Sequence, residues 1–296
     1  MSGSFYSKFS THKKGLFLIS IAALFWSTGG MFIKLLPLDP WVISFYRSLI
    51  AGITIIIVSA LKKKKVKYSF DPISLSCIAA YSGILILFVL ATKFTTAANA
   101  IFLQYAAPVY LVILEPVFLK TRFDRKSLIT VLICLSGMTL FFFGRLEAGN
   151  LLGNILAILS GMCFALFSLF LKWKKQVHRS DDTISNVILG NLLVGVICLP
   201  VVFTHLSLTS PQLLTLIYLG AIQIGISYMI FNEGLKYVSA TESMIIGMLE
   251  AVFNPVWVFL SIGEMPSIFA IAGGIIILAA VLWRSLQTGS KLQIID

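Results

Sequence analysis

The feature that most constrains this chain is a series of long stretches without a charged side chain. An α-helix needs about 20 residues to cross the ~30 Å hydrocarbon core of a bilayer. Only 12% of the 296 residues are charged, whereas a soluble domain carries about a quarter. The chain is therefore predicted to lie in a membrane. Six charge-free stretches have at least 18 residues: Leu16–Ile33, Pro72–Thr92, Phe94–Leu114, Ser127–Gly144, Ala148–Leu171 and Met265–Trp283.

A longer charge-free run, Thr183–Asn232, divides at a proline-containing segment, and two further apolar segments contain internal charges. We therefore expect an all-α polytopic membrane protein with ten transmembrane helices. Their predicted ranges are 14–35, 40–61, 72–92, 97–119, 126–144, 151–172, 183–203, 212–235, 242–263 and 266–285. Two five-helix units, 14–144 and 151–285, are joined by a linker at 145–150, and residues 1–13 and 286–296 form tails.

The distribution of basic residues predicts the topology. With the N-terminus in the cytoplasm, 19 of the 23 lysines and arginines fall in inner segments. Cytoplasmic loops carry such an excess, so both termini are predicted to be cytoplasmic and the protein to lie in the cytoplasmic membrane. The lysine-rich segment at 61–67 is then an inner loop. Nucleic acid is not an expected partner.

The chain also repeats itself. Residues 91–97 align with 234–240 at an offset of 143, and near the start of each half the offset is 138. At the second offset, Ala23, Ser27 and Gly30 fall opposite Gly161, Ala165 and Ser168. Small residues let membrane helices approach closely, so packing alone could explain them. Because each half has an odd number of spans, the second half should be inverted, which is typical of secondary transporters.

Four segments carry a family resemblance: "FWSTGGMFIK", "SFYRSLIAG", "TTAANAIFLQYAAPVY" and "ATESMIIGMLEAVFNPVWVFLSIGE". In their order, spacing and duplication they resemble paired EamA-type domains of the drug/metabolite transporter superfamily, over about residues 15–285. The resemblance implies a ten-helix 5+5 bundle around a central cavity. The chain departs from the family pattern at Thr121, where a glutamate is usual, and at Ala251, where a proline is usual.

Two ionisable side chains lie at membrane depth, where an uncompensated charge costs at least ~2.5 kcal/mol. Glu250 is roughly 12 Å from the inner surface at about 1.5 Å per residue. It could bind a substrate ammonium group, carry a coupling proton, or serve as a structural partner for a buried donor. Arg47 could hold a carboxylate or extend its head towards the surface. The structural role is favoured for Arg47, because the resemblance implies a peripheral position for its helix.

Uncharged residues complete the candidate substrate-binding set. Together with Glu250 it comprises Trp26, Gln104, Tyr105, Tyr228 and Asn232. Pro108, Asn254 and Pro255 are candidate kink or gating residues. Proline removes a helical hydrogen bond and collides with the preceding turn, so Pro255 should kink its helix near Ala251.

Other polar residues are expected at helix ends. Glu115 should form ion pairs with Lys120 and Arg122 at the membrane surface. Glu242 completes a capping-box pattern with Ser239, and Glu264 lies at the outer end of the same helix. The histidines at 12, 178 and 205 fall in tails or loops, so we predict no catalytic residues, metal ligands or cofactor.

These features predict a secondary transporter for a small polar metabolite, such as an amino acid or a related amine–carboxylate compound. It would work by alternating access, as an exporter or exchanger, with a proton as a candidate coupling ion. No phosphate-binding loop occurs, which argues against direct use of ATP. The alternatives are a channel or non-transporting scaffold and, lowest in rank, an intramembrane enzyme. The oligomeric state is left open, and a monomer would suffice.

Overall fold

The computed structural model describes residues 2–63, 66–141, 143, 150–178, 183–203, 208–262 and 267–291. Within these ranges, side chains are described except at 2–10, 98, 141, 178, 254, 255, 258, 259, 261, 262 and 286–291. Every regular element in the described part is helical. The elements are α1 (Ser2–Trp26), α2 (Gly29–Leu35), α3 (Pro40–Leu61), α4 (Pro72–Phe94), α5 (Ala97–Gln104), α6 (Ala107–Leu119), α7 (Arg125–Phe141), α8 (Leu151–His178), α9 (Ile184–Val202), α10 (Ser210–Ile217), η1 (Tyr218–Ile226), α11 (Ser227–Gly234), α12 (Ala240–Gly247), α13 (Leu249–Ile262) and α14 (Ile268–Lys291).

Helices that begin at a strong capping signal agree best with the sequence prediction. α3 has the predicted bounds, because Asp39 accepts a hydrogen bond from the Trp41 N–H and Pro40 occupies the first turn. α4 begins in the same way, with Asp71 accepting from the N–H groups of Ile73 and Ser74. A side-chain oxygen followed by proline fixes a helix start by local chemistry alone.

Four predicted helices are interrupted. The range 14–35 divides into α1 and α2, 97–119 into α5 and α6, and 242–263 into α12 and α13. The range 212–235 contains α10, α11 and, between them, a nine-residue π-helix, η1. Three helices run more than one turn further than predicted: α1 begins at Ser2, α8 reaches His178 and α14 reaches Lys291. No proline lies in these three extensions to stop the helix.

Eight helical segments are long and apolar enough to cross a membrane. They match eight of the ten predicted spans. The remaining two predictions correspond to α7, which has 17 residues, and to α12–α13, part of whose side chains lie outside the described set. The ten-helix arrangement in two inverted halves therefore stays a prediction.

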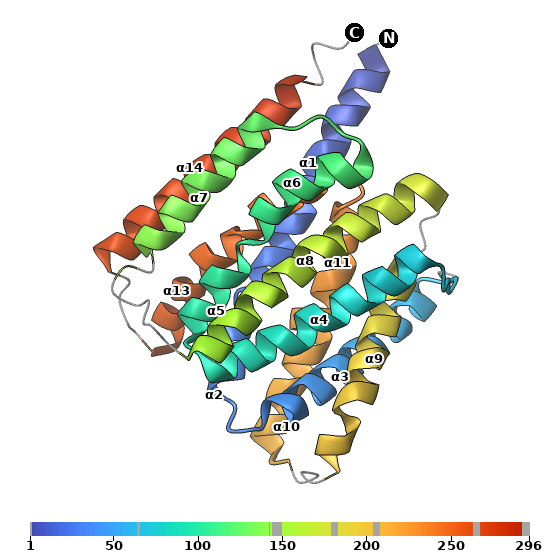
Figure 1. Cartoon of the computed structure of the whole chain (residues 1–296), viewed down its shortest axis with the longest axis vertical. Helices are drawn as coiled ribbons and strands as arrows, with labels where there is room; N and C mark the ends of the chain where they lie inside the picture. Colours follow the sequence, from blue (N-terminus) through green and yellow to red (C-terminus); the bar gives the residue numbers. More distant parts are fainter. Residues whose placement is uncertain are drawn as a thin grey trace.

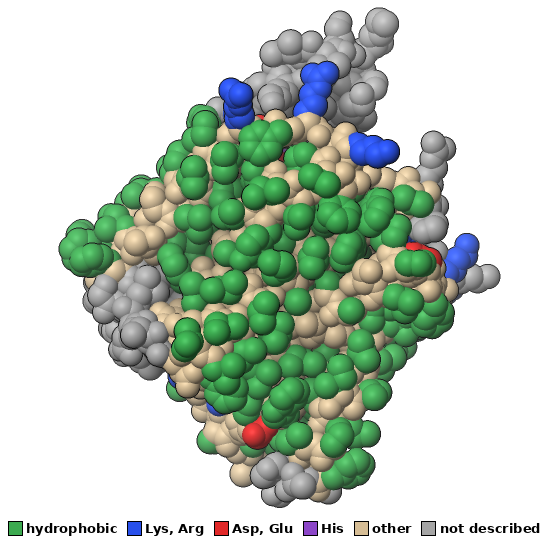
Figure 2. Space-filling view, in the orientation of Figure 1, with side chains coloured by type: hydrophobic (Ala, Val, Ile, Leu, Met, Phe, Trp, Pro, Cys, Tyr) green, Lys and Arg blue, Asp and Glu red, His purple; other side chains and the backbone are tan. Residues whose placement is uncertain are grey.

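The helices form one bundle in which α1 begins and α14 ends at the same end, which we call the termini end (Figure 1). Neighbouring pairs include α4 with α8, α7 with α14, and α3 with α9. On the face in view, apolar side chains cover the middle of the molecule, and lysine or arginine side chains stand at the termini end (Figure 2). An apolar belt with basic groups at one end is suited to a bilayer.

Candidate functional site

Two of the four interrupted helices meet at the centre of the molecule. α5 and α6 are separated by Tyr105 and Ala106, and α12 and α13 by Met248. Tyr105 and Met248 are equivalent at the 143-residue offset of the repeat. The Tyr105 hydroxyl lies 2.7 Å from the carbonyl oxygen of Gly247 and 2.6 Å from Oε2 of Glu250. The first break thus contacts both sides of the second.

α6, from the first broken helix, and α12, from the second, run in opposite directions. Tyr105 precedes α6 and contacts the end of α12, whereas Glu115, further along α6, bonds to Ala240 and Thr241 at the start of α12. Contacts that advance along one helix and retreat along the other define an antiparallel pair. This is the relation expected of equivalent helices in inverted halves.

A small cavity lies beside these breaks. Its volume is about 30 Å³, which is room for about one water molecule and not for an amino acid. It is lined by Trp26, Arg47, Ile84, Leu85, Phe88, Gln104, Phe164, Gln223, Ile224, Tyr228 and Glu250. The cavity is smaller than an amino acid, so a solute of that size could bind here only after side chains or helices moved.

Opposite charges line this cavity without pairing to each other. Glu250 is 5% exposed and Arg47 is 3% exposed. Glu250 is bonded to Tyr105, and Arg47 donates from Nε and Nη2 to Oε1 of Gln223, at 3.2 and 2.8 Å. Within the described part of the chain, no ion pair joins the two. Each of these two ionisable groups is instead hydrogen-bonded to a neutral side chain.

The contacts of Tyr105 depend on the protonation of Glu250. A phenol has one hydrogen to donate, and the Gly247 carbonyl can only accept. If Tyr105 donates to Gly247, its short contact with Glu250 requires a protonated carboxyl group that donates to the phenol oxygen. If Glu250 is ionised, Tyr105 donates to it instead. One proton on Glu250 therefore allows both contacts to be hydrogen bonds at the same time.

Aromatic rings form the other side of the cavity. The Trp26 ring lies 4.9 Å from Tyr228, 5.1 Å from Phe231 and 5.5 Å from Phe164, measured between centroids. Phe164 is equivalent to Trp26 at the 138-residue offset. Trp26 is 4% exposed, and its indole Nε1–H has no hydrogen-bond partner. An unpaired buried donor at a cavity is a place for a solute or water acceptor.

The structure brings four of the predicted binding residues, Trp26, Gln104, Tyr228 and Glu250, to one cavity, with Tyr105 bonded to Glu250. It places Asn232 elsewhere. The Asn232 Oδ1 accepts a hydrogen bond from Thr183, beside a different cavity of about 10 Å³. Gln104 donates to Ser160 at 2.8 Å. The role of this set in binding stays a prediction.

The candidate kink residues differ in position. Pro108 lies in the first turn of α6, directly after the break at Tyr105 and Ala106. The side chains of Asn254 and Pro255 lie outside the described set, and α13 continues through both. The break at Met248 is one turn earlier than the predicted kink at Ala251. At this break, the Ala251 N–H donates to the Met248 carbonyl, and the Tyr105 hydroxyl contacts the Gly247 carbonyl.

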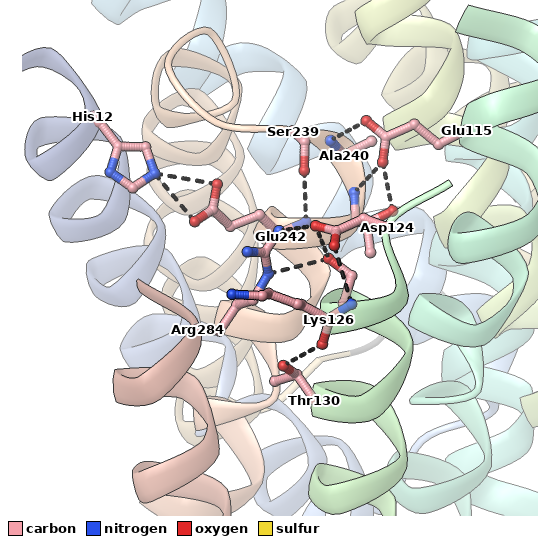
Figure 3. A network of polar contacts seen from close by, with 11 residues as sticks. His12, Glu115, Asp124, Lys126, Thr130, Ser239, Ala240, Glu242 and Arg284 are labelled. Carbon is pink, nitrogen blue, oxygen red and sulfur yellow. Dashed lines mark hydrogen bonds and ion pairs between the residues drawn. The ribbon is translucent and has the colours of Figure 1, made fainter. Parts of the chain in front are cut away.

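A second, larger cavity lies at the termini end. Its volume is about 550 Å³, and none of its lining residues lines the central cavity. Polar groups from both halves meet there (Figure 3). The carboxylate of Glu115 accepts from the N–H groups of Ala240 and Thr241, at 3.1 and 2.8 Å, and from the Thr241 hydroxyl. The predicted role of Glu115 in surface ion pairs was wrong, because its carboxylate caps α12.

The same end contains a buried histidine. His12 was expected in a tail, but it lies in α1, and its Nε2 is 3.1 Å from Oε1 of Glu242. Ser239 accepts from the Glu242 N–H, so half of the predicted capping box is present. The other half is absent from the described contacts, since the Glu242 side chain faces His12 (Figure 3). Glu264 lies outside the described residues.

Sequence reasoning missed two members of the central site. The helix of Arg47 was expected at the periphery, and Gln223 was not singled out. Both are large polar side chains at membrane depth in otherwise apolar spans, which is the available signal. What the sequence lacked was the orientation of each helix about its axis, which decides which polar groups face the centre.

The sequence comparisons agree with this architecture. Residues 13–143 and 151–286 each match the EamA-like transporter family. The chain belongs to this family of membrane transporters, and it is an integral membrane protein. The family resemblance of its sequence motifs is thereby confirmed.

Individual relatives extend over nearly the whole chain. A protein of Archaeoglobus fulgidus, named an uncharacterized transporter, is 26% identical over 276 residues, covering 89% of this chain and 94% of the relative. One from Clostridium kluyveri with the same description is 22% identical over 287 residues, covering 90% and 91%. A protein of solved crystal structure superposes with a TM-score of 0.79 at 15% identity, covering 93% and 98%, and shares the fold.

Proposed function

We propose that the protein is a secondary transporter for a small zwitterionic metabolite, an amino acid or a related amine–carboxylate compound. Glu250 binds the solute ammonium group and Arg47 binds its carboxylate. The observation that carries this proposal is the pair of opposite, separately held charges at one buried cavity. A solute that brings both complementary charges compensates both groups at once, which neither a simple cation nor a simple anion does.

The transport cycle is alternating access in a ten-helix 5+5 inverted repeat. The central cavity has room for about one water molecule, so binding of an amino acid requires side chains or helices to move. The breaks at Tyr105–Ala106 and Met248 provide equivalent hinges in the two halves. The bias of basic residues supports cytoplasmic termini in the cytoplasmic membrane, with the wide cavity at the cytoplasmic end. One chain contains the complete cavity, so a monomer suffices.

A proton is the proposed coupling ion, and transport is export or exchange. Glu250 holds either the solute ammonium group, as a carboxylate, or a proton, as an acid that donates to Tyr105. Only the second state allows both short contacts of the Tyr105 hydroxyl to be hydrogen bonds. Solute and proton would therefore replace each other at the same carboxylate.

The test is counterflow in proteoliposomes. The vesicles are loaded with one unlabelled compound and entry of its labelled form is followed, with and without a pH gradient. The panel includes L-leucine, because Ile84, Leu85, Phe88 and Ile224 give the cavity an apolar side, with other amino acids, and nucleosides as compounds lacking the zwitterion. Accelerated entry of an amino acid is expected. A channel would give no counterflow, and a scaffold would give no entry.

The matched variant is Glu250→Gln, which keeps the shape of the side chain and removes its charge. Counterflow should fall by more than about tenfold, since a charge-assisted hydrogen bond contributes about 1.5–3 kcal/mol. The protein should stay inserted and monodisperse. Wild-type counterflow by this variant at every pH would contradict the assigned role of Glu250.

A further inference from the structure

We propose that Gln223 is the residue that makes the cavity selective for a carboxylate. It holds one edge of the Arg47 guanidinium with a neutral acceptor and leaves the other edge charged and open to the solute. This inference rests on the proposed function and deepens it, because it names the positioning residue behind the selectivity for a carboxylate.

The first argument is the geometry of the guanidinium. Nε carries one hydrogen, and each Nη carries two, all in one plane. Nε and Nη2 of Arg47 both donate to the single oxygen Oε1 of Gln223. Gln223 thereby uses the edge formed by Nε and one Nη2 hydrogen. The hydrogens left over belong to Nη1 and to the far side of Nη2, which together form the edge that binds a carboxylate in two parallel bonds.

The second argument is charge. The Gln223 amide satisfies the geometry of Arg47 without neutralising it. A glutamate of the same shape would do both and would compete with the solute. The other ionisable or polar groups that line the cavity are Glu250, which is bonded to Tyr105, and Gln104, Tyr228 and the indole N–H of Trp26. Within the described residues, Arg47 thus reaches the cavity with its charge uncompensated by a direct ion pair.

The third argument is that Gln223 is itself held in place. It lies in the π-helix η1. π-Helices are rare in proteins, and those that occur are often found at functional sites. The Nε2 of Gln223 faces the Trp26 carbonyl at 3.4 Å. A Cβ atom at Gly29 would lie 2.4 Å from the same Nε2, so a larger residue there would displace the amide from this position. The break between α1 and α2 and the π-helix therefore meet at this side chain.

The test uses two variants of the full-length protein in the counterflow assay with labelled L-leucine. Unlabelled L-leucine and L-leucinamide compete for the site; the amide keeps the ammonium group and loses the carboxylate. Gln223→Glu introduces a charge that pairs with Arg47. The inhibition constant of L-leucine should rise about tenfold or more at about pH 7.5, while that of L-leucinamide should stay within about twofold.

Acid provides the readout that a purely structural role would not move. When the glutamate of Gln223→Glu takes up a proton it again resembles glutamine, so the preference for L-leucine should return towards the wild-type value measured at the same lower pH. Gln223→Met, which keeps the volume and removes the acceptor, should lose the preference at both pH values. This variant separates loss of position from gain of charge.

The outcomes are distinguishable. If the wild type prefers L-leucine over L-leucinamide and Gln223→Glu keeps the same preference at both pH values, the inference is overturned and the proposed function stands. If the wild type itself does not distinguish the two compounds, a carboxylate is not recognised, and the proposed function and this inference both fail. A preference lost in Gln223→Glu and regained in acid supports both.

Discussion

The broken helices α5–α6 and α12–α13 are interrupted at equivalent positions, but their sequences at the break differ. The first has Pro108 in the turn after the break, and the second has Ala251 at the equivalent position. Both are nevertheless broken. The break at Met248 therefore does not need a proline at that position. The contact of Tyr105 with the Gly247 carbonyl gives the second break a hydrogen-bond partner from the first.

The beginnings of the two broken helices differ more. At α5 the neutral groups of Thr95, Asn99 and Asn154 bond to each other, at 2.8 to 3.3 Å. At α12 the contacts involve charged groups, with Glu115 capping the helix and Glu242 facing His12. The charged end opens on the cavity of about 550 Å³. The start of α5 is thus stabilised by neutral side chains, and the equivalent start of α12 is stabilised by ionisable side chains.

The largest expected effect comes from removing the carboxylate of Glu115 at the start of α12. Glu115→Ala removes the acceptor of two buried N–H groups and of the Thr241 hydroxyl. Unsatisfied buried donors cost about 1–3 kcal/mol each, so the free energy of unfolding should fall by about 3 kcal/mol. Denaturant titration in mild detergent measures it. A loss below about 1 kcal/mol would mean that this carboxylate does not hold α12.

The contact between the two breaks should contribute less. Tyr105→Phe keeps the ring and removes the hydroxyl that reaches Gly247 and Glu250. Loss of one hydrogen bond to a charged group costs about 1.5 kcal/mol, so the counterflow rate should fall about tenfold. Tyr110→Phe is the control and should behave as wild type, because the Tyr110 hydroxyl makes no hydrogen bond within the described part of the chain. Equal rates in the two variants would show that the breaks are not coupled through Tyr105.

The N-cap of α5 should contribute less again to stability. Thr96 accepts from the Asn99 N–H at the start of α5, and Ser239 does the same for Glu242 at the equivalent position of α12. Thr96→Ala should lower the free energy of unfolding by about 1 kcal/mol, the usual value of an N-cap. If the loss equals that of Glu115→Ala, the difference between the two ends disappears.

The smallest effect concerns the start of α4. Burial opposes ionisation of Asp71, but hydrogen bonds from Ser74 and Ser69 outweigh it and lower the pKa of Asp71 well below its usual range. A lowered pKa in the folded state adds stability above the unfolded pKa of about 4, and this is lost as the pH falls further. At the equivalent cap of α10, Thr209 has no charge to lose.

Asp71→Asn should therefore reduce stability at neutral pH by up to about 1 kcal/mol, because it removes a negative charge at the N-terminus of α4. It should also flatten the decline below about pH 4. The measurement is the unfolding midpoint as a function of pH, with Thr209→Ser as the control that leaves the acid slope unchanged. An unchanged acid slope in Asp71→Asn would assign the decline to other carboxyl groups.

The sequence predicts a helix boundary or interruption when residues next to it in the chain determine it. α3 was predicted to the residue because Asp39 and Pro40 start it by themselves. The breaks at Ser27–Thr28 and in η1 were not predicted, because no proline marks them and they depend on neighbours such as Gln223 packed against Gly29. Long-range packing of this kind is absent from any single segment.

The candidate site shows the same limit. Depth along a helix can be counted, and that placed Arg47 and Glu250 at membrane depth. The direction that a side chain faces about the helix axis cannot be counted in the same way. Asn232, one turn beyond Tyr228, faces Thr183 and a different cavity. Arg47 was assigned to the periphery and lies at the centre.

The most direct test of the central claim is competition for wild-type counterflow by three matched compounds. L-leucine has both charges, L-leucinamide lacks the carboxylate, and N-acetyl-L-leucine lacks the ammonium group. Because Arg47 and Glu250 line one cavity, a competitor that lacks either charged group should inhibit about tenfold or more weakly than L-leucine. Equal inhibition by all three would contradict a site that recognises both ends of a zwitterion.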